Sequence, residues 1–242
     1  MTSITILQSA ADTRPDWVSR CMTSVADWSQ QHGYSYHCIG DELFNWVTPE
    51  LRAKLHDRIP ILADLARLRW LEAELSERGT LVVWIDADTL VVDPTWRVPD
   101  STHTFFGEEC WVQPTAERSW RAYQSPHNAF MGFTATSPVL GFLAYLSESI
   151  IERADAAHIA PQMVGPKLLK ALNNLAQFTL VPEAGAVSPE LLAEWVGEAG
   201  PATTCYEQAT RAPLTLVNLC SSLTHSEEAV RRVEQFLARY GA

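Results

Sequence analysis

Along the first third of the chain, segments with the apolar spacing of a strand are followed by segments with the apolar spacing of a helix. The predicted elements are strands over 3–8 and 34–39, a helix over 15–31, short helical pieces over 41–58, and a helix from Pro60 to about Ser76 that ends at Gly79. Strand, helix and strand in this order predict the start of an α/β sheet flanked by helices.

The second half of the chain carries a weaker pattern. It predicts strands over 104–106 and 129–134 joined by a polar, aromatic loop, helices over 138–154 and 165–174, a strand over 178–181, loops over 182–213, a strand over 214–217 and a closing helix over 226–240. No repeat or clear boundary interrupts the pattern, and 242 residues suit one large α/β domain. We therefore expect a single domain over 1–242.

Composition and charge exclude several classes of protein. Apolar residues make up 47% of the chain, which is enough for a sizeable core. The net charge is −11 and no Lys/Arg run occurs, so we expect no nucleic-acid partner. No apolar run is long enough to span a bilayer, and the N-terminus does not resemble a signal peptide. The five cysteines are odd in number and lack CxxC spacing. Together with the N-terminal sequence, they predict a cytoplasmic protein with reduced thiols.

Residues 81–94 carry the strongest functional signal. Five apolar residues run directly into Asp86, and Asp88 follows two positions later. Such a run is typical of a strand buried on both faces, and ligands of open α/β sheets bind at the carboxyl ends of strands. Two carboxylates there are costly unless a cation meets them. The pattern predicts a metal site or a phosphate-handling site, with both side chains pointing the same way from extended chain.

Three interpretations of this carboxylate pair compete. The two residues hold a divalent cation that bridges a nucleotide diphosphate sugar; or they belong to a haloacid-dehalogenase-type phosphatase; or they only cap a turn. The phosphatase pattern places its Thr one position later than Thr89 and needs a later acidic pair. Beyond Asp100 the chain has a single Asp, Asp155. Glutamates could substitute, but no fitting cluster is evident.

Neighbouring segments favour the first interpretation. Residues 61–70 read ILADLARLRW, residues 82–88 read VVWIDAD, and residues 164–169 read VGPKLL. Together these segments resemble the DXD sugar-transferase signature of GT-A-fold enzymes, such as the yeast-type initiating mannosyltransferases and the glucosylating bacterial toxins. Val164 and Trp84 replace the Thr and Tyr common in that family. The resemblance implies a GT-A-like fold with a Rossmann-like, mostly parallel central sheet flanked by helices.

The resemblance also implies roles for the donor side, over 1–100. Asp86 and Asp88 would hold the metal and act in catalysis. Asp64 and Arg67, which share a helix face, would contact the donor sugar through hydroxyl and phosphate oxygens. Gln8 and Ser9, at the end of the first strand, would meet the nucleotide base.

Further candidates lie in 101–242, the expected acceptor side. The resemblance implies that Asn128 faces the donor sugar as a catalytic residue, with His127 a weaker candidate, and that His225 adds a third metal ligand. An imidazole ligand favours Mn²⁺ over Mg²⁺. Glu108 and Glu109 are candidates for an acceptor-side base or a solvated pair, and Trp111, Trp120 and Tyr123 for an acceptor platform or for packing under a loop.

The function implied is a metal-dependent transfer of a hexose from a UDP- or GDP-linked donor, with retention of anomeric configuration. The acceptor is open: a glycan, a lipid-linked molecule or a small molecule. Besides the phosphatase, a non-catalytic module that binds nucleotide sugars remains an alternative.

Overall fold

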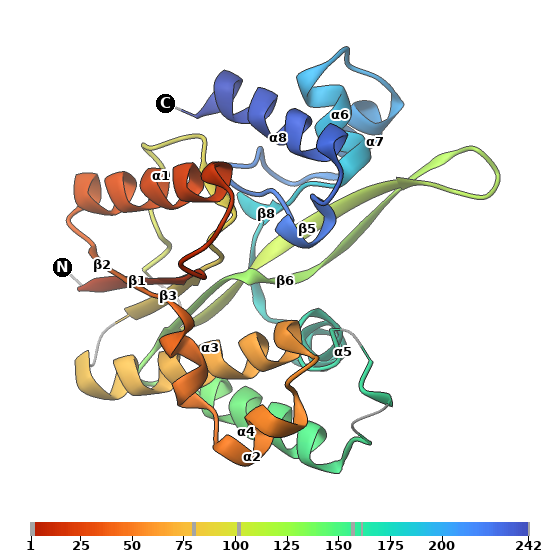
Figure 1. The fold of residues 1–242 in the computed structure, drawn as a ribbon. Coiled ribbons are helices and arrows are strands. Elements are labelled where there is room, and N and C mark those ends of the chain that lie inside the picture. The colour runs from red at the N-terminus through yellow and green to blue at the C-terminus, as the bar shows by residue number, and fades with distance from the viewer. Residues whose placement is uncertain (1–2, 79–80, 101–102, 156–157, 161, 242) are drawn as a thin grey trace.

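A six-stranded sheet lies between two layers of helices in the computed structural model, which describes residues 3–78, 81–100, 103–155, 158–160 and 162–241 (Figure 1). Its strands are β1 (Ile4–Ser9), β2 (Ser35–Ile39), β3 (Leu81–Ile85), β5 (Thr104–Pro114), β6 (Trp120–Thr134) and β7 (Thr179–Val181), in the order β2-β1-β3-β6-β5-β7. Pairs β1–β2, β1–β3 and β5–β7 are parallel, whereas β3–β6 and β5–β6 are antiparallel. The predicted α/β sheet flanked by helices is confirmed, and the sheet is mixed.

Two groups of helices cover the two faces of this sheet (Figure 1). On one side lie α1 (Asp16–His32), α6 (Pro189–Val196), α7 (Pro201–Ala209) and α8 (Glu227–Tyr240); on the other lie η1 (Asp41–Trp46), α2 (Pro49–Lys54), α3 (Ile59–Arg78), α4 (Val139–Arg153) and α5 (Pro166–Ala176). The helices predicted over 15–31, 60–76, 138–154, 165–174 and 226–240 are confirmed to within a few residues. Gly79, the predicted end of α3, lies outside the described residues.

Strand β3 is the centre of the fold. Leu81, Val83 and Ile85 pack in the core cluster that includes Val25 and Trp28 of α1. The alternate residues Val82 and Trp84 pack in the cluster beneath α3 and α4. The strand is therefore buried on both faces, as its apolar sequence predicts. Each fully buried aliphatic side chain contributes about 1.5–3 kcal/mol, so this strand is a rigid platform for the residues that follow it.

A turn and a small second sheet follow β3. The carbonyl oxygen of Asp86 accepts a hydrogen bond from the backbone N–H of Thr89 at 3.1 Å, which closes a turn over residues 86–89. The chain then enters a three-stranded sheet of β4 (Thr89–Val91), β9 (Leu216–Asn218) and β8 (Ala184–Ala186), in the order β4-β9-β8. The expectation of extended chain between Asp86 and Asp88 was wrong, because the chain turns here to change sheets.

Two segments of the second half differ from the sequence prediction. The expected aromatic loop between two short strands is a long antiparallel hairpin, β5–β6, whose outer part extends beyond the helical layers (Figure 1). The region 182–213, expected as loops, contains β8, α6 and α7. Pro189 and Pro201 stand in the first turns of these helices, where a missing N–H costs nothing.

None of the described helices combines the length and the apolar character that crossing a bilayer requires.

Candidate functional site

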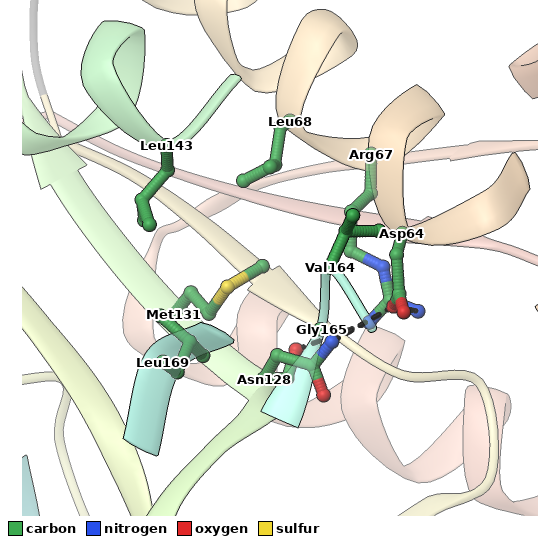
Figure 2. Close-up of a pocket in the computed structure, with 9 residues that line it drawn as sticks. All are labelled: Asp64, Arg67, Leu68, Asn128, Met131, Leu143, Val164, Gly165 and Leu169. Atoms are coloured by element: carbon green, nitrogen blue, oxygen red, sulfur yellow. Dashed lines mark hydrogen bonds and ion pairs between the residues drawn. The ribbon is translucent and has the colours of Figure 1, made fainter. Parts of the chain in front are cut away.

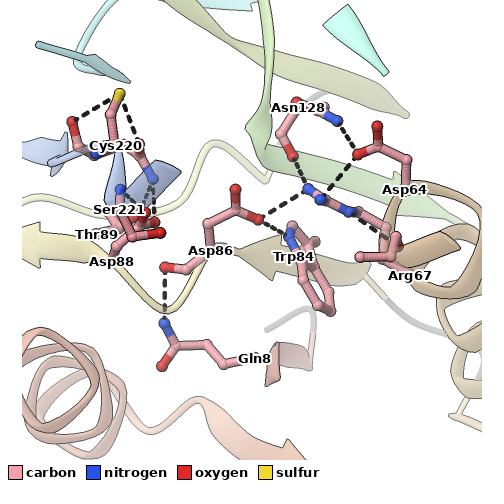
Figure 3. Close-up of polar contacts among 12 residues, drawn as sticks. Gln8, Asp64, Arg67, Trp84, Asp86, Asp88, Thr89, Asn128, Cys220 and Ser221 are labelled. Atoms are coloured by element: carbon pink, nitrogen blue, oxygen red, sulfur yellow. Dashed lines mark hydrogen bonds and ion pairs between the residues drawn. The ribbon is translucent and has the colours of Figure 1, made fainter. Parts of the chain in front are cut away.

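Arg67 is the centre of a buried ionic network at the carboxyl end of β3 (Figure 3). Its Nη2 lies 2.9 Å from Asp64 Oδ1 on the same helix, and its Nη1 lies 2.9 Å from Asp86 Oδ1. The side chains of Arg67 and Asp64 are only 11% and 9% exposed. Asp64 and Arg67 are three positions apart, so they share one face of α3. Because α3 packs beside β3, this face meets Asp86, the first carboxylate after the strand.

Trp84, which precedes Asp86 by two positions, holds the same carboxylate from the strand. Its Nε1 donates to Asp86 Oδ1 at 2.5 Å, and the guanidinium carbon of Arg67 lies 5.2 Å from the centroid of its ring. Asp86 Oδ2 accepts no hydrogen bond from the described residues. One oxygen of Asp86 is thus fixed by two donors, while the other is available to a ligand.

Asn128 and Gly165 complete the network on the side of α5 (Figure 2). Asn128 Nδ2 donates to Asp64 Oδ1 at 2.8 Å, and the Asn128 carbonyl accepts from Arg67 Nη1 at 3.1 Å. Gly165 is the N-cap of α5, and a Cβ on it would lie 2.4 Å from Asp64 Oδ2. The glycine therefore allows the start of α5 to approach the network closely.

Asp88 is held by a different part of the chain. Its Oδ1 accepts from Asn218 Nδ2 at 2.6 Å, and its Oδ2 accepts from the backbone N–H of Ser221 at 2.7 Å. Ser221 opens the 3₁₀ turn η3 (Ser221–Leu223), and Cys220 before it has the left-handed φ of 50°. A non-glycine residue in this conformation carries strain that such sites often retain.

The electrostatics of these groups favour a cation. Burial raises the pKa of Asp64 above its usual value, although Arg67 opposes the shift. Burial also raises the pKa of Asp88, and the nearby charge of Asp86 adds to it. Burial alone would lower the pKa of Arg67, but Asp86, Asp64 and Asp88 outweigh it and raise that pKa. The negative charge at the end of β3 is therefore costly without a further cation.

These side chains line an open cleft of about 610 Å³. Its lining is Pro60, Asp64, Arg67, Asp86, Asp88, Glu109, Trp111, His127, Asn128, Gln162, Pro166, Asn218, Cys220, Ser221, Ser222 and Leu223. Four carboxylates thus face one guanidinium, so a diphosphate would be repelled unless cations accompanied it.

The available ligands fit a hard divalent cation. Asp86 and Asp88 offer carboxylate oxygens, which Mg²⁺ and Mn²⁺ prefer. Among the described residues no three His, Cys, Asp or Glu side chains lie close enough to hold a metal by themselves. Mg²⁺ is usually held by one or two carboxylates and by substrate phosphates, so two aspartates are sufficient when a diphosphate supplies the other oxygens.

The structure gathers eight of the predicted residues at one cleft: Asp64, Arg67, Asp86, Asp88, Glu109, Trp111, His127 and Asn128. His225, by contrast, is exposed just after η3 and is not part of the cleft lining. Its role as a third metal ligand therefore stays a prediction without support from the geometry.

The predicted base-binding residues have structural partners instead. Gln8 is fully buried; its Nε2 donates to the Asp86 carbonyl at 3.2 Å, and its Oε1 accepts from the Tyr36 hydroxyl at 2.7 Å. Ser9 Oγ donates to the Gly40 carbonyl at 3.1 Å. Gln8 therefore holds the turn after β3 in place, and its side chain has no exposed surface that could contact a nucleotide base.

The acceptor-side candidates divide between the two faces of the hairpin. Glu109 and Trp111 line the cleft, whereas Glu108 points away and forms a bidentate ion pair with Arg211, with N–O distances of 2.6 and 2.8 Å. A base role for Glu108 is thus contradicted. Trp120 and Tyr123 lie farther along the hairpin, outside the cleft.

Asn218 and Ser221 were missed by the sequence prediction as partners of Asp88. They follow it by 130 and 133 positions. The only signal for them was their place after the last strand, shortly before His225.

Comparisons with known proteins bear on the fold. No family model matches the chain, and no curated protein matches it. It is similar to the crystal structure of a glycosyltransferase involved in the glycosylation of the major capsid of PBCV-1, with a TM-score of 0.53 and 13% identity over 98% of this chain and 99% of that one. The likeness shows a shared fold, consistent with the GT-A-like fold that the sequence predicts.

Proposed function

We propose that the protein transfers a hexose from a UDP- or GDP-linked sugar to an acceptor, with Mn²⁺ or Mg²⁺ at Asp86 and Asp88. The observation that carries the proposal is the buried network of Asp64, Arg67 and Asp86, which lies beside Asp88 in one cleft at the carboxyl end of β3. The fold shared with a glycosyltransferase supports it.

Each residue of the network has a specific task in this proposal. A cation between Asp86 and Asp88 would neutralise the diphosphate as the glycosidic bond to it breaks. Arg67 and Trp84 fix one oxygen of Asp86, so that its other oxygen faces the ligand. Asn218 and the backbone N–H of Ser221 each donate to one oxygen of Asp88, which fixes the orientation of this carboxylate in the cleft.

Asp64 and Asn128 would hold the donor sugar. Their side chains form a hydrogen-bonded pair on the wall of the cleft, next to the N-terminus of α5. A carboxylate and an amide can together accept from and donate to the hydroxyls of one sugar ring. We further propose that the transfer retains the anomeric configuration, as the sequence resemblance implies, so that an inverting general base is not needed.

A thermal-shift panel tests the donor and the metal together. UDP, GDP and their hexose conjugates are each added with and without Mn²⁺, to the wild type and to Asp86→Asn. A ligand at about 100 times its Kd adds roughly 2.7 kcal/mol of stability. We expect Mn²⁺-dependent stabilisation by one nucleotide family, lost in Asp86→Asn. Stabilisation that is absent with every nucleotide contradicts the proposal.

Turnover assays separate the two alternatives. Tight nucleotide binding without hydrolysis or transfer of any donor supports a non-catalytic binding module. Phosphate release from an aryl phosphate, lost in Asp86→Asn, supports a phosphatase.

A further inference from the structure

One face of the hairpin β5–β6 lines the cleft and continues beyond it toward the end of the hairpin. Side chains alternate along a strand, and those of Glu108, Cys110 and Val112 are buried. The opposite face of β5 therefore carries Glu109, Trp111 and Gln113.

The register of the hairpin identifies the matching face of β6. Glu109 pairs with Ser125, Trp111 with Tyr123, and Gln113 with Arg121. His127 continues this face toward the network around Asp64. Trp111 and Tyr123 thus lie directly opposite each other, where cross-strand side chains are closest.

Two hollows follow one another along this face. Glu109, Trp111 and His127 line the cleft of about 610 Å³ that holds the carboxylates. Gln113, Arg121 and Tyr123 line a second hollow of about 500 Å³ near the end of the hairpin. From His127 to Arg121 the strand rises about 3.3 Å per residue, or roughly 20 Å in all. The face is therefore long enough for a chain of several linked rings.

The side chains of this face combine flat apolar surfaces with hydrogen-bonding groups. Tyr123 is 36% exposed, and Trp111 is half-buried beside it. Ser125 Oγ donates to Glu109 Oε2 at 3.4 Å, and His127 Nε2 lies 3.8 Å from Glu109 Oε1. The Nδ1 of His127 is buried and has no partner among the described residues. Such an unpaired nitrogen is costly unless a ligand satisfies it.

We propose that this face binds the acceptor and that the acceptor is an oligosaccharide. A sugar ring has an apolar C–H face that stacks on an aromatic ring, and a rim of hydroxyls that needs polar partners. Trp111 and Tyr123 supply the rings; Glu109, Ser125, Gln113 and His127 supply the partners. The inner end of the glycan lies at His127, next to Asp64 and Asn128.

Other ligands fit this face less well. An alkyl chain would leave the polar side chains on either side of the two rings unsatisfied. Nucleic acid is disfavoured by the net charge of −11 and by Glu109 on the face itself. A peptide acceptor is the competing macromolecule, and binding to a peptide library distinguishes it from a glycan.

The inference rests on the proposed function but can be tested without turnover. Wild-type protein, Trp111→Ala, Tyr123→Ala and Tyr123→Phe are applied to an array of immobilised oligosaccharides and to a peptide library. Gln124→Ala is the matched control, because Gln124 adjoins Tyr123 but points to the other face, where it donates to the Ala209 carbonyl at 2.7 Å. Stabilisation by UDP or GDP with Mn²⁺ is measured on each sample.

We expect the wild type and Gln124→Ala to bind the same oligosaccharides. Trp111→Ala and Tyr123→Ala should lose about tenfold or more in affinity, since one stacked ring is worth at least about that factor, and Tyr123→Phe should restore it. The inference is overturned if the protein binds peptides but no saccharide, or if it binds neither. It is also overturned if both alanine variants bind with unchanged affinity. If nucleotides fail to stabilise the wild type while the glycan result holds, the proposed donor function fails and the glycan site stands.

Discussion

Arg67 Nη1 lies 2.9 Å from Asp86 Oδ1, although 19 positions separate the two residues in the chain. This contact connects helix α3 to the end of strand β3. It brings a helix motif and a strand motif to one place in the fold, because the guanidinium of the helix orients the carboxylate of the strand.

Replacement of Arg67 by Met should destabilise the protein strongly. It leaves Asp64 and Asp86 as partly buried charges without their common partner, which costs about 3–5 kcal/mol for a buried pair. Urea unfolding measures the change, with Arg52→Met as the control, since within the described part of the chain the partly exposed Arg52 side chain donates only to Asn45 Oδ1, at 3.2 Å. A loss no larger than that of the control contradicts the network.

Trp84→Phe should weaken metal binding while keeping the fold. The ring still packs in the core, but Asp86 Oδ1 loses the N–H at 2.5 Å that orients it. Loss of such an outer partner typically costs 10- to 100-fold in metal affinity, so we expect a decrease of about tenfold. Titration with Mn²⁺ in the presence of UDP or GDP measures it.

Trp28→Phe is the matched control for this variant. Its Nε1 donates to the Trp96 carbonyl at 2.9 Å, in the core between α1 and the sheet. An equal loss of Mn²⁺ affinity in both variants would show that Trp84 acts through general stability.

Gly165→Ala should disturb the site and the fold together. Its Cβ would lie 2.4 Å from Asp64 Oδ2 and 2.9 Å from Asn128 Nδ2, so one of the elements must shift. Overpacking of this kind costs about 1–3 kcal/mol. In Gly141→Ala, on the exposed side of α4, the nearest atom is 3.5 Å away, and helix propensity should add about 0.5–1 kcal/mol. Thermal unfolding should therefore move in opposite directions; a stabilising Gly165→Ala contradicts the close approach of α5.

Glu194 should make stability depend on pH. Burial tends to raise the pKa of its carboxyl, but the N–H groups of Thr203, Ala202 and Gly200 outweigh it and lower the pKa below the ordinary 4.5. This stabilisation is fully present above pH 4.5 and is lost as the pH falls through the lower folded-state pKa.

Glu194→Gln tests this directly. We expect a loss of about 1–2 kcal/mol at pH 7, as for a helix N-cap, because the carboxylate accepts three N–H groups at the start of α7. The difference from wild type should shrink as the pH falls below 4.5 in urea unfolding. A difference that is constant with pH would show that the charge of Glu194 does not matter.

The sequence predicted those parts of the fold whose signals are local. Strand β3 has five consecutive apolar residues, and α3 has a clear apolar stripe, so both were confirmed. The hairpin was missed because its exposed face carries polar and aromatic residues such as Arg121 and Tyr123, which are also typical of a loop. Helices α6 and α7 were missed because their prolines and glycines also mark loops.

The site was predictable on one side only. Asp64, Arg67, Asp86 and Asp88 stand in short motifs, and the structure brings them to one cleft. Asn218 and Ser221 reach Asp88 only because β9 pairs with β4, which no local pattern reveals.

The most direct test is the release of nucleotide diphosphate from a panel of UDP- and GDP-hexoses, measured with and without Mn²⁺. The account predicts Mn²⁺-dependent release by the wild type and by Asp93→Asn, a control in the turn after β4 whose carboxylate contacts only Thr95 in the hydrogen bonds of the described residues. Asp86→Asn should lose about 100-fold or more, since it removes a charged metal ligand. Equal release by Asp86→Asn, or no release by the wild type from any donor, would contradict a metal-dependent glycosyl transfer at Asp86 and Asp88.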